Sequence, residues 1–469
     1  MSSDIPPVGK VPFPVSGERF EKTDIQQVLD HYYGNAPDQS CAGCNLSILQ
    51  IGKSPLQEPQ NKKAGMIEPD AAQHWGSVSK QFTAACVIKL VEKGKLSLSD
   101  DIRDPKFKLQ LPELLFAGTA QKVTVDHLLQ MRSGLPEMTT LSALGGQDDL
   151  SNSMEEKLEL LRKYPFLESK PGSTKQYRNT NYYLLAEIVH ALDEKGRSFP
   201  DFVREEIFAA HGMQSRSSAD PSCPRSIQGY DPEFHPIPLQ YSTWGASGVV
   251  GRPSDMAKWN AALDKGRYSA LVESVRQPLA SGETHYARGL NVGRLGDYTV
   301  IRHAGSIRGF ATQFMRFEHP DPNRNFAFFL ATNIDDIERS EEAAFEIANI
   351  LAGEDLHMEI EREPPPPKPV VVSEHELKPY VGIYENKALG LGYQVLARED
   401  KEKRTWVLQL QLNQAGKESK EIASFVPTRD KAEDPVVFRG PIGDWLEFNE
   451  KRELVLKGAK VAPFILNRS

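Results

Sequence analysis

Cysteine is scarce in this chain, with four among 469 residues, at positions 41, 44, 86 and 223. So few cysteines exclude a disulfide-stapled scaffold. Cys41 and Cys44 form a single C-x-x-C, which would suit a redox pair or half of a zinc site, but no second pair of cysteines or histidines completes such a site. We therefore expect a turn leading into the strand NLSILQI, and we predict no metal and no other cofactor.

An excess of positive charge and a long apolar run are also missing. The formal net charge is -8, whereas nucleic-acid binders usually carry a basic surface, so nucleic acid is not an expected partner. No uncharged apolar stretch reaches the length of a membrane helix. The first 20 residues lack the basic and apolar regions of a signal peptide. We expect a cytoplasmic protein without a membrane partner, and the sequence leaves its oligomeric state open.

A run of prolines divides the chain, whose length already favours two or more domains. The segment EREPPPPKP (361–369) contains four consecutive prolines, which favour a stiff extended spacer. We predict a first domain over 1–360, a proline-rich linker over 361–374 and a C-terminal β domain over 375–469. Short alternating segments such as TWVLQLQL predict that this last domain is a small antiparallel β-barrel.

Periodicity along the first domain predicts strands at its two ends and helices between them. A polar segment at 53–74 is predicted to be a loop, and Ser254 is predicted to cap a helix through 256–263. The other predicted elements are strands at 44–51, 298–303, 310–317 and 325–333, and helices at 78–93, 181–193 and 340–352.

The pattern Ser77-Val78-Ser79-Lys80 carries the most chemistry. A serine and a lysine three residues apart on a helix lie on one face, one turn apart. Ser77 falls at the helix N-terminus, where free N–H groups favour developing negative charge. A serine hydroxyl needs an adjacent base, and Lys80 can serve only if its pKa is lowered. The structural alternative is a capping serine beside a solvated lysine.

Two shorter patterns accompany this one. Tyr177-Arg178-Asn179 precedes a predicted helix, and His303-Ala304-Gly305 stands at the end of a predicted strand, before a turn. Each pattern alone is too short to be specific. A nucleophile, a base and a phenol that can give up its proton are nevertheless the parts that acyl transfer needs.

Five stretches in order resemble the serine β-lactamase, penicillin-binding protein and D-aminopeptidase superfamily, near its class C-like branch. They are GSVSKQFTAACVIKLVEKGKLSLSDDI (76–102), VTVDHLLQMRSGL (123–135), PGSTKQYRNTNYYLLAEIV (171–189), WGASGVVGRPSDMAKW (244–259) and RHAGSIRGF (302–310). The resemblance implies an α/β fold of the β-lactamase type, with an antiparallel sheet flanked by helices and a helical subdomain. The trailing β domain is loosely similar to the accessory barrels of D-aminopeptidases, and segment 53–74 departs from the family's usual hairpin.

The resemblance also implies catalytic roles for three residues. Ser77 would be the acylated nucleophile, Lys80 would be its base or would hold it in place, and Tyr177 would relay a proton to the leaving group. Which of Lys80 and Tyr177 is the base stays open. A protonated Lys80 would favour the Tyr177 phenolate.

Four further residues would bind the substrate if the resemblance holds. Asn179 would bond the substrate and the Lys80 ammonium, while His303 and Gly305 would line the opposite wall. The backbone N–H groups of Ser77 and Ser306 would form an oxyanion hole, a preorganised donor pair for developing negative charge.

His303 departs from the family pattern, because many members have a lysine there that attracts a substrate carboxylate. A histidine is only about a quarter charged at pH 7 by its reference pKa. We therefore place first the hydrolysis of amide or peptide bonds in a small-molecule or short-peptide substrate, as in D-aminopeptidases. An esterase or acyltransferase with the same site, a non-catalytic binding protein and a β-lactamase are the alternatives.

Overall fold

The strand β14 (Phe326–Thr332) shows how the first domain is layered, because all seven of its residues are buried. Its alternate side chains enter two separate hydrophobic cores. Phe326, Phe328 and Leu330 join one core, and Ala327, Phe329 and Ala331 join the other. Since successive side chains of a strand point to opposite faces, β14 belongs to a sheet that is covered on both sides.

This sheet is antiparallel throughout, with the strand order β10-β11-β12-β13-β14-β1-β2. The structure is a computed structural model that describes residues 24–37, 40–49, 60–145, 153–238, 245–266, 268–272, 284–353, 356–358, 369–413, 419–428, 437–439, 445–448, 453–457 and 464–468. The strands besides β14 are β1 (Gly43–Leu49), β2 (Gln60–Gly65), β10 (Thr284–Tyr286), β11 (Asn291–Leu295), β12 (Tyr298–Ile307) and β13 (Phe310–Glu318).

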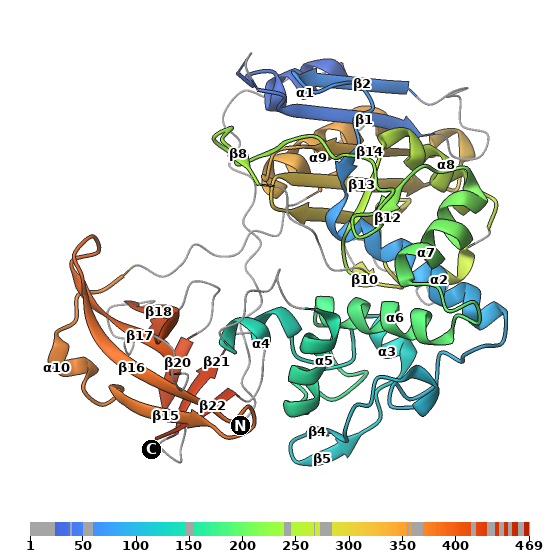
Figure 1. The fold of residues 1–469 in the computed structure, drawn as a ribbon. Coiled ribbons are helices and arrows are strands. Elements are labelled where there is room, and N and C mark those ends of the chain that lie inside the picture. Colours follow the sequence, from blue (N-terminus) through green and yellow to red (C-terminus); the bar gives the residue numbers. More distant parts are fainter. Residues whose placement is uncertain are drawn as a thin grey trace.

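Helices cover both faces of the sheet (Figure 1). The helices α1 (Ile25–Tyr33) and α9 (Ile337–Ala352) pack into one core. The helices α2 (Lys80–Glu92) and α8 (Pro253–Asp264) pack into the other, where α2 is buried on almost every side, as its apolar sequence predicts. Ser254 does not cap α8, because it lies inside the helix and its hydroxyl donates to the Asp70 carboxylate.

Between β2 and β10 the chain forms a helical region that also contains short strands. Its helices are α3 (Val125–Leu129), α4 (Met138–Leu144), α5 (Met154–Lys163), α6 (Asn179–Leu192) and α7 (Phe199–Val203). Its strands are β3 (Gln73–His74), β4 (Leu114–Phe116), β5 (Thr119–Gln121), β6 (Arg216–Ser217), β7 (Gly229–Tyr230), β8 (Pro236–Ile237) and β9 (Val249–Gly251). The mixed helices and antiparallel sheets agree with the fold class that the sequence predicts.

The prediction of a loop over 53–74 is wrong at 60–65 and at 73–74, which form β2 and β3. Residues 60–65 form β2, which pairs antiparallel with β1, with Leu46 opposite Lys62. The polar sequence of β2 suits its place at the edge of the sheet, where only one side of the strand has a neighbour. The two strands therefore supply the antiparallel pair that the sequence suggested was missing, and residues 50–59 between them lie outside the described part.

The C-terminal part is an antiparallel β unit around a hydrophobic core to which the helical region also contributes. Its strands pair in chain order from β15 to β22, and β22 also pairs with β15. They are β15 (Gly382–Asn386), β16 (Leu391–Asp400), β17 (Thr405–Asn413), β18 (Lys420–Thr428), β19 (Val437–Arg439), β20 (Trp445–Phe448), β21 (Leu454–Lys457) and β22 (Phe464–Arg468), preceded by α10 (Glu374–Leu377). The four linker prolines fall at 364–367, outside the described residues.

This β unit contacts the helical region beside α4 (Figure 1). Leu141 and Leu144 of α4 belong to the same hydrophobic core as Tyr393 of β16. The Tyr393 hydroxyl donates a hydrogen bond of 3.0 Å to the Leu144 carbonyl oxygen. Within the described part of the chain, none of the helices combines the length and the apolar character that crossing a bilayer requires.

Candidate active site

Ser77 lies in the 3₁₀ turn η1 (Gly76–Ser79), directly before α2. Two hydrogen bonds hold this turn: Thr312 Oγ1 donates to the Trp75 carbonyl oxygen at 3.0 Å, and Ser79 Oγ donates to that of Gly76 at 2.6 Å. Gly76 has a positive φ of 51°, and a Cβ there would lie 2.8 Å from the backbone nitrogen of Ser306. Glycine is therefore required at position 76 both by conformation and by space.

Lys80 is fully buried and its amine touches the serine. Its Nζ donates to Ser77 Oγ at 2.9 Å, to Asn179 Oδ1 at 2.8 Å and to the Ala246 carbonyl oxygen at 2.7 Å. Burial lowers the pKa of Lys80 to about 7, and the Glu137 carboxylate opposes this fall. About half of the Lys80 amines are thus neutral at pH 7, and the alternative of a solvated lysine is wrong.

Tyr177 lies against the same amine, with its ring centroid 4.9 Å from Lys80 Nζ. Its hydroxyl is hydrogen-bonded to the Ser77 side chain, while about a third of the residue's surface is exposed. Burial raises the pKa of Tyr177 well above its ordinary value, the hydrogen bond from Ser77 lowers it in part, and Glu137 raises it further. The electrostatics therefore favour a neutral phenol, and the phenolate expected from the sequence is not favoured.

Asn179 is the first residue of α6, and a neighbouring segment holds it in place. Its backbone N–H donates to Glu137 Oε2 at 2.7 Å, and Ser133 Oγ donates to Asn181 Oδ1 at 2.6 Å. Thr180 Oγ1 also accepts the Met138 N–H at 2.7 Å. The S-G-L-P-E segment is therefore clamped to the segment that carries Tyr177 and Asn179.

His303 lies in the middle of β12, not at its end, because the strand continues to Ile307 before it turns. The small residues Ala304 and Gly305 let this part of the strand approach η1. A Cβ at Gly305 would clash with the Trp75 carbonyl oxygen and would lie 3.2 Å from the backbone nitrogen of Ser77. The backbone nitrogens of Ser77 and Ser306 are thus brought to neighbouring positions at one end of the site.

The imidazole of His303 is neutral, and each of its two nitrogens has a hydrogen-bond partner. Its Nδ1 lies 2.6 Å from the Ala304 carbonyl oxygen, which can only accept, so Nδ1 carries the proton. Its Nε2 lies 3.2 Å from the Tyr286 hydroxyl and accepts from it. Burial, and then the nearby Lys80, lower the pKa of His303 to about 3. The quarter charge expected from the reference pKa is therefore absent, and His303 offers no cation to a substrate carboxylate.

Sequence reasoning missed three contributors to this site. The Tyr286 hydroxyl bonds Nε2 of His303, the Ala246 carbonyl accepts from Lys80, and Glu137 is a buried carboxylate that binds Asn179. Glu137 had a usable signal, because it stands two positions after the matched S-G-L segment and directly before a helix. Nothing in the sequence around Tyr286 connects it to His303.

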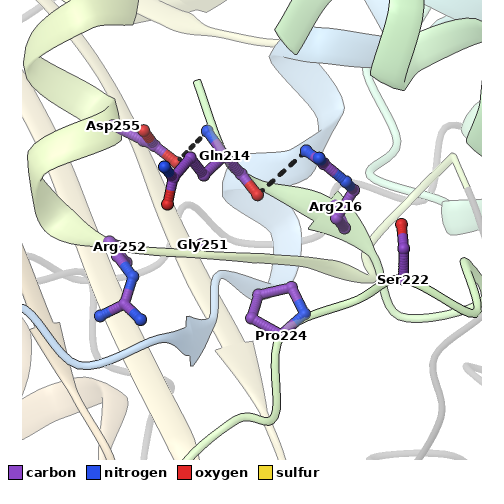
Figure 2. Close-up of a pocket in the computed structure, with 7 residues that line it drawn as sticks. All are labelled: Gln214, Arg216, Ser222, Pro224, Gly251, Arg252 and Asp255. Carbon is purple, nitrogen blue, oxygen red and sulfur yellow. Dashed lines mark hydrogen bonds between the residues drawn. The ribbon is translucent and has the colours of Figure 1, made fainter. Parts of the chain in front are cut away.

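A separate pocket of about 280 Å³ lies beside Gly251, the last residue of β9 (Figure 2). Its wall includes the side chains of Arg216 and Arg252, and Figure 2 shows Arg216 bonded to the carbonyl oxygen of Gln214. None of the predicted site residues lines this pocket. Its buried Asp255 is already bonded to the Gln214 N–H, the Ser215 hydroxyl and the Lys258 amine.

One group of side chains among the described residues has the spacing of metal ligands. The ligand atoms of Asp231, Glu233 and His235 lie within 4.8 Å of one another. The Asp231 carboxylate accepts the backbone N–H groups of both Glu233 and His235, which is the hydrogen bonding of a surface turn. We assign no metal to this group, and it contains none of the predicted site residues.

The fold and the meeting of Ser77, Lys80 and Tyr177 define a protein of the serine β-lactamase, penicillin-binding protein and D-aminopeptidase superfamily. The family described as Beta-lactamase matches residues 26–352, more than half of the chain, and the chain belongs to this family. Its recognition from the five sequence stretches is confirmed.

Curated relatives include an aminopeptidase and a hydrolase by name. A D-aminopeptidase from Brucella anthropi is 29% identical over 248 residues, which cover 50% of this chain and 45% of that protein. An unguisins hydrolase from Aspergillus campestris is 26% identical over 273 residues, which cover 53% of this chain and 50% of that protein. The chain thus spans about half the length of the curated relatives it matches.

Solved structures share the fold at low sequence identity. The D-amino acid amidase from Ochrobactrum anthropi SV3 matches 70% of this chain and 100% of its own, with a TM-score of 0.54 and 23% identity. The octameric penicillin-binding protein homologue from Pyrococcus abyssi matches 91% of this chain and 96% of its own, with a TM-score of 0.53 and 20% identity. At these identities the likeness concerns the fold.

Proposed function

We propose that this protein is a serine hydrolase that forms an acyl-enzyme on Ser77. The observation that carries the proposal is the hydrogen bond of 2.9 Å between Lys80 Nζ and Ser77 Oγ, made by an amine that burial leaves about half neutral at pH 7. A hydroxyl next to a base whose pKa matches the working pH is the arrangement that nucleophilic catalysis requires.

In the proposed acylation, neutral Lys80 accepts the Ser77 proton while Oγ attacks the substrate carbonyl carbon. The negative charge on the carbonyl oxygen would be held by the backbone N–H groups of Ser77 and Ser306, and such donors contribute about 3–4 kcal/mol each. The bond to the leaving group then breaks, and the leaving group takes the proton of the Tyr177 phenol. The Lys80 ammonium returns a proton to Tyr177, which restores both groups.

Deacylation would use the same groups on a water molecule. The water attacks the acyl carbon, its proton passes to Lys80, and Ser77 Oγ leaves and regains a proton. The raised pKa of Tyr177 supports a role as proton donor rather than as base. The lowered pKa of Lys80 supports its role as the base, which the sequence had left open.

We propose an amide or short-peptide substrate, as the names of the D-aminopeptidase and D-amino acid amidase relatives suggest. The neutral His303 supports substrates that have no carboxylate at this wall, which argues against penicillin-type substrates. The same observation suits a neutral ester, so an esterase or acyltransferase is the second candidate.

The test is a serine-directed fluorophosphonate probe followed by intact-mass measurement. We expect one covalent adduct on the full chain and none on Ser77→Ala. A folded protein that takes up no probe would instead be a binding protein. Rates on D-alanine p-nitroanilide and on p-nitrophenyl acetate then separate the two enzymatic candidates, because a strong preference for the ester rules out the peptidase.

We also propose the domain division 1–360, 361–374 and 375–469, with the last part closed into a small barrel. The family match ends at residue 352, before the proline run, which supports the first boundary. The pairing of Tyr384 in β15 with Arg468 in β22 joins the first and last strands of the C-terminal unit, as closure requires.

A further inference from the structure

Glu137 is a buried carboxylate at the N-terminus of α6, next to the groups assigned to catalysis. It is 4% exposed, and its Oε2 accepts the Asn179 N–H at 2.7 Å. Its Oε1 lies 3.4 Å from the Thr180 hydroxyl, which donates its proton to the Pro136 carbonyl oxygen at 2.7 Å. A carboxylate is well placed at a helix N-terminus, where free N–H groups carry partial positive charge, so its negative charge is stabilised there despite burial.

The same carboxylate is linked to the amine through one residue. Asn179 donates its N–H to Glu137 and accepts Lys80 Nζ on its side-chain oxygen at 2.8 Å. We propose that Glu137 is a positioning residue that fixes Asn179 and, through its charge, sets the proton affinity of Lys80. The inference rests on the proposed function in that Lys80 is taken to be the base.

Among the described residues, the other groups that face Lys80 provide no negative charge. Ser77, Asn179 and the Ala246 carbonyl are neutral hydrogen-bond partners. The rings of Tyr177 and Tyr182 lie 4.9 and 5.9 Å from Nζ, and burial keeps the pKa of both phenols raised. His303 on the opposite strand is neutral.

Two opposing effects therefore act on the Lys80 amine. Burial lowers its pKa, and the Glu137 charge raises it. Without Glu137 the ammonium would be destabilised further, so the neutral base would persist to lower pH. Glutamine at position 137 keeps the shape of the side chain and an oxygen acceptor for the Asn179 N–H. The Glu137→Gln variant therefore removes the charge while it keeps the hydrogen bond.

The test is the pH profile of kcat/KM for p-nitrophenyl acetate in the wild type and in Glu137→Gln. In the wild type, kcat/KM should fall below pH about 7, where Lys80 becomes protonated. In Glu137→Gln the fall should begin at lower pH, and the rate at pH 5.5 relative to the plateau should rise at least about threefold. If kcat/KM of the folded Glu137→Gln variant falls at the same pH as that of the wild type, the inference is overturned.

The matched control is Glu168→Gln. Glu168 is also a buried carboxylate beside the Tyr177 segment, but it pairs with Arg178, with Oε2 2.6 Å from the guanidinium. This change removes the same charge without touching Asn179 or Lys80, so the acid limb should stay in place. If the acid limb moved equally in both variants, the cause would be a general loosening of the site. That result would count against the proposed role of Glu137.

A direct readout keeps this inference separate from the proposed function. Lysine labelled with ¹³C at Cε allows the titration of Lys80 to be followed by NMR, with its signal identified by its loss in Lys80→Met. A lower titration midpoint in Glu137→Gln supports the inference even if Ser77 takes up no probe, and an unchanged midpoint overturns it even in an active enzyme.

Discussion

Lys80 loses its hydration when the protein folds, and the surrounding groups replace water only in part. Three acceptors surround its amine, but all are neutral, and the Glu137 carboxylate is linked to it through Asn179. Because desolvation disfavours the charged form, the pKa falls to about 7. The buried position that destabilises the ammonium is thus what makes the amine useful as a base.

At the scale of the residue, Lys80→Ala and Tyr177→Phe should each lower kcat at least about a hundredfold, the usual size for a general base or acid. The measurement is steady-state turnover of the preferred substrate, with circular dichroism to verify folding. Tyr182→Phe is the control, because its hydroxyl donates to the Leu129 carbonyl oxygen and not to Ser77. Near-normal turnover in either of the first two variants removes that residue from the mechanism.

At the scale of the element, the site depends on the close approach of β12 to η1. Glycines at 76 and 305 allow this approach, since a Cβ at either would collide with the backbone of the other element. Gly76 and Gly305 are both buried at this contact, so neither backbone can withdraw without disturbing the sheet.

Gly305→Ala should therefore abolish formation of the Ser77 adduct, because the new methyl group would displace the Trp75 carbonyl and with it the backbone of Ser77. The probe assay measures this loss, which should exceed about a hundredfold in labelling rate. Gly392→Ala serves as the control, since a Cβ there would meet nothing closer than 3.9 Å. Normal labelling of Gly305→Ala would show that η1 tolerates the shift.

At the scale of the whole molecule, the C-terminal β unit is connected to the active site through α4. Tyr393 of β16 bonds the carbonyl oxygen of Leu144 at the end of this helix, and Glu137 precedes its first residue. Any movement of the β unit that tilts α4 would displace Glu137 and, through their hydrogen bond, Asn179. The unit is therefore placed to support the site, and none of its described residues is among the site residues assigned above.

Tyr393→Phe should destabilise the end of α4, because it leaves the Leu144 carbonyl without this donor, a loss of about 1–3 kcal/mol for a buried group. Hydrogen exchange of the amides in 138–144 should become faster. Tyr384→Phe is the matched control, since its hydroxyl donates to the Tyr380 carbonyl inside the β unit. Equal exchange of α4 in the wild type and in Tyr393→Phe would argue against this connection.

Local pattern determined much of this protein from the sequence. Apolar spacing predicted α2, α6 and α9 and the strands β1, β12, β13 and β14. An element that buries one or both faces has apolar residues at the regular spacing of its secondary structure. The polar edge strand β2 and the true start of α8 escaped that reasoning. An edge strand needs little apolar sequence, and Ser254 had a partner, Asp70, that lies far away in the chain.

The sequence by itself determined the family, and its motifs predicted Ser77, Lys80, Tyr177 and Asn179 as site residues, since a motif is a local arrangement of side chains. Only the tertiary structure decided their protonation, because a pKa depends on what the fold brings near and on how much water it removes. Burial lowers the pKa values of Lys80 and His303 and raises the pKa of Tyr177. Glu137 entered the site for the same reason, through contacts between segments some 42 residues apart in the chain.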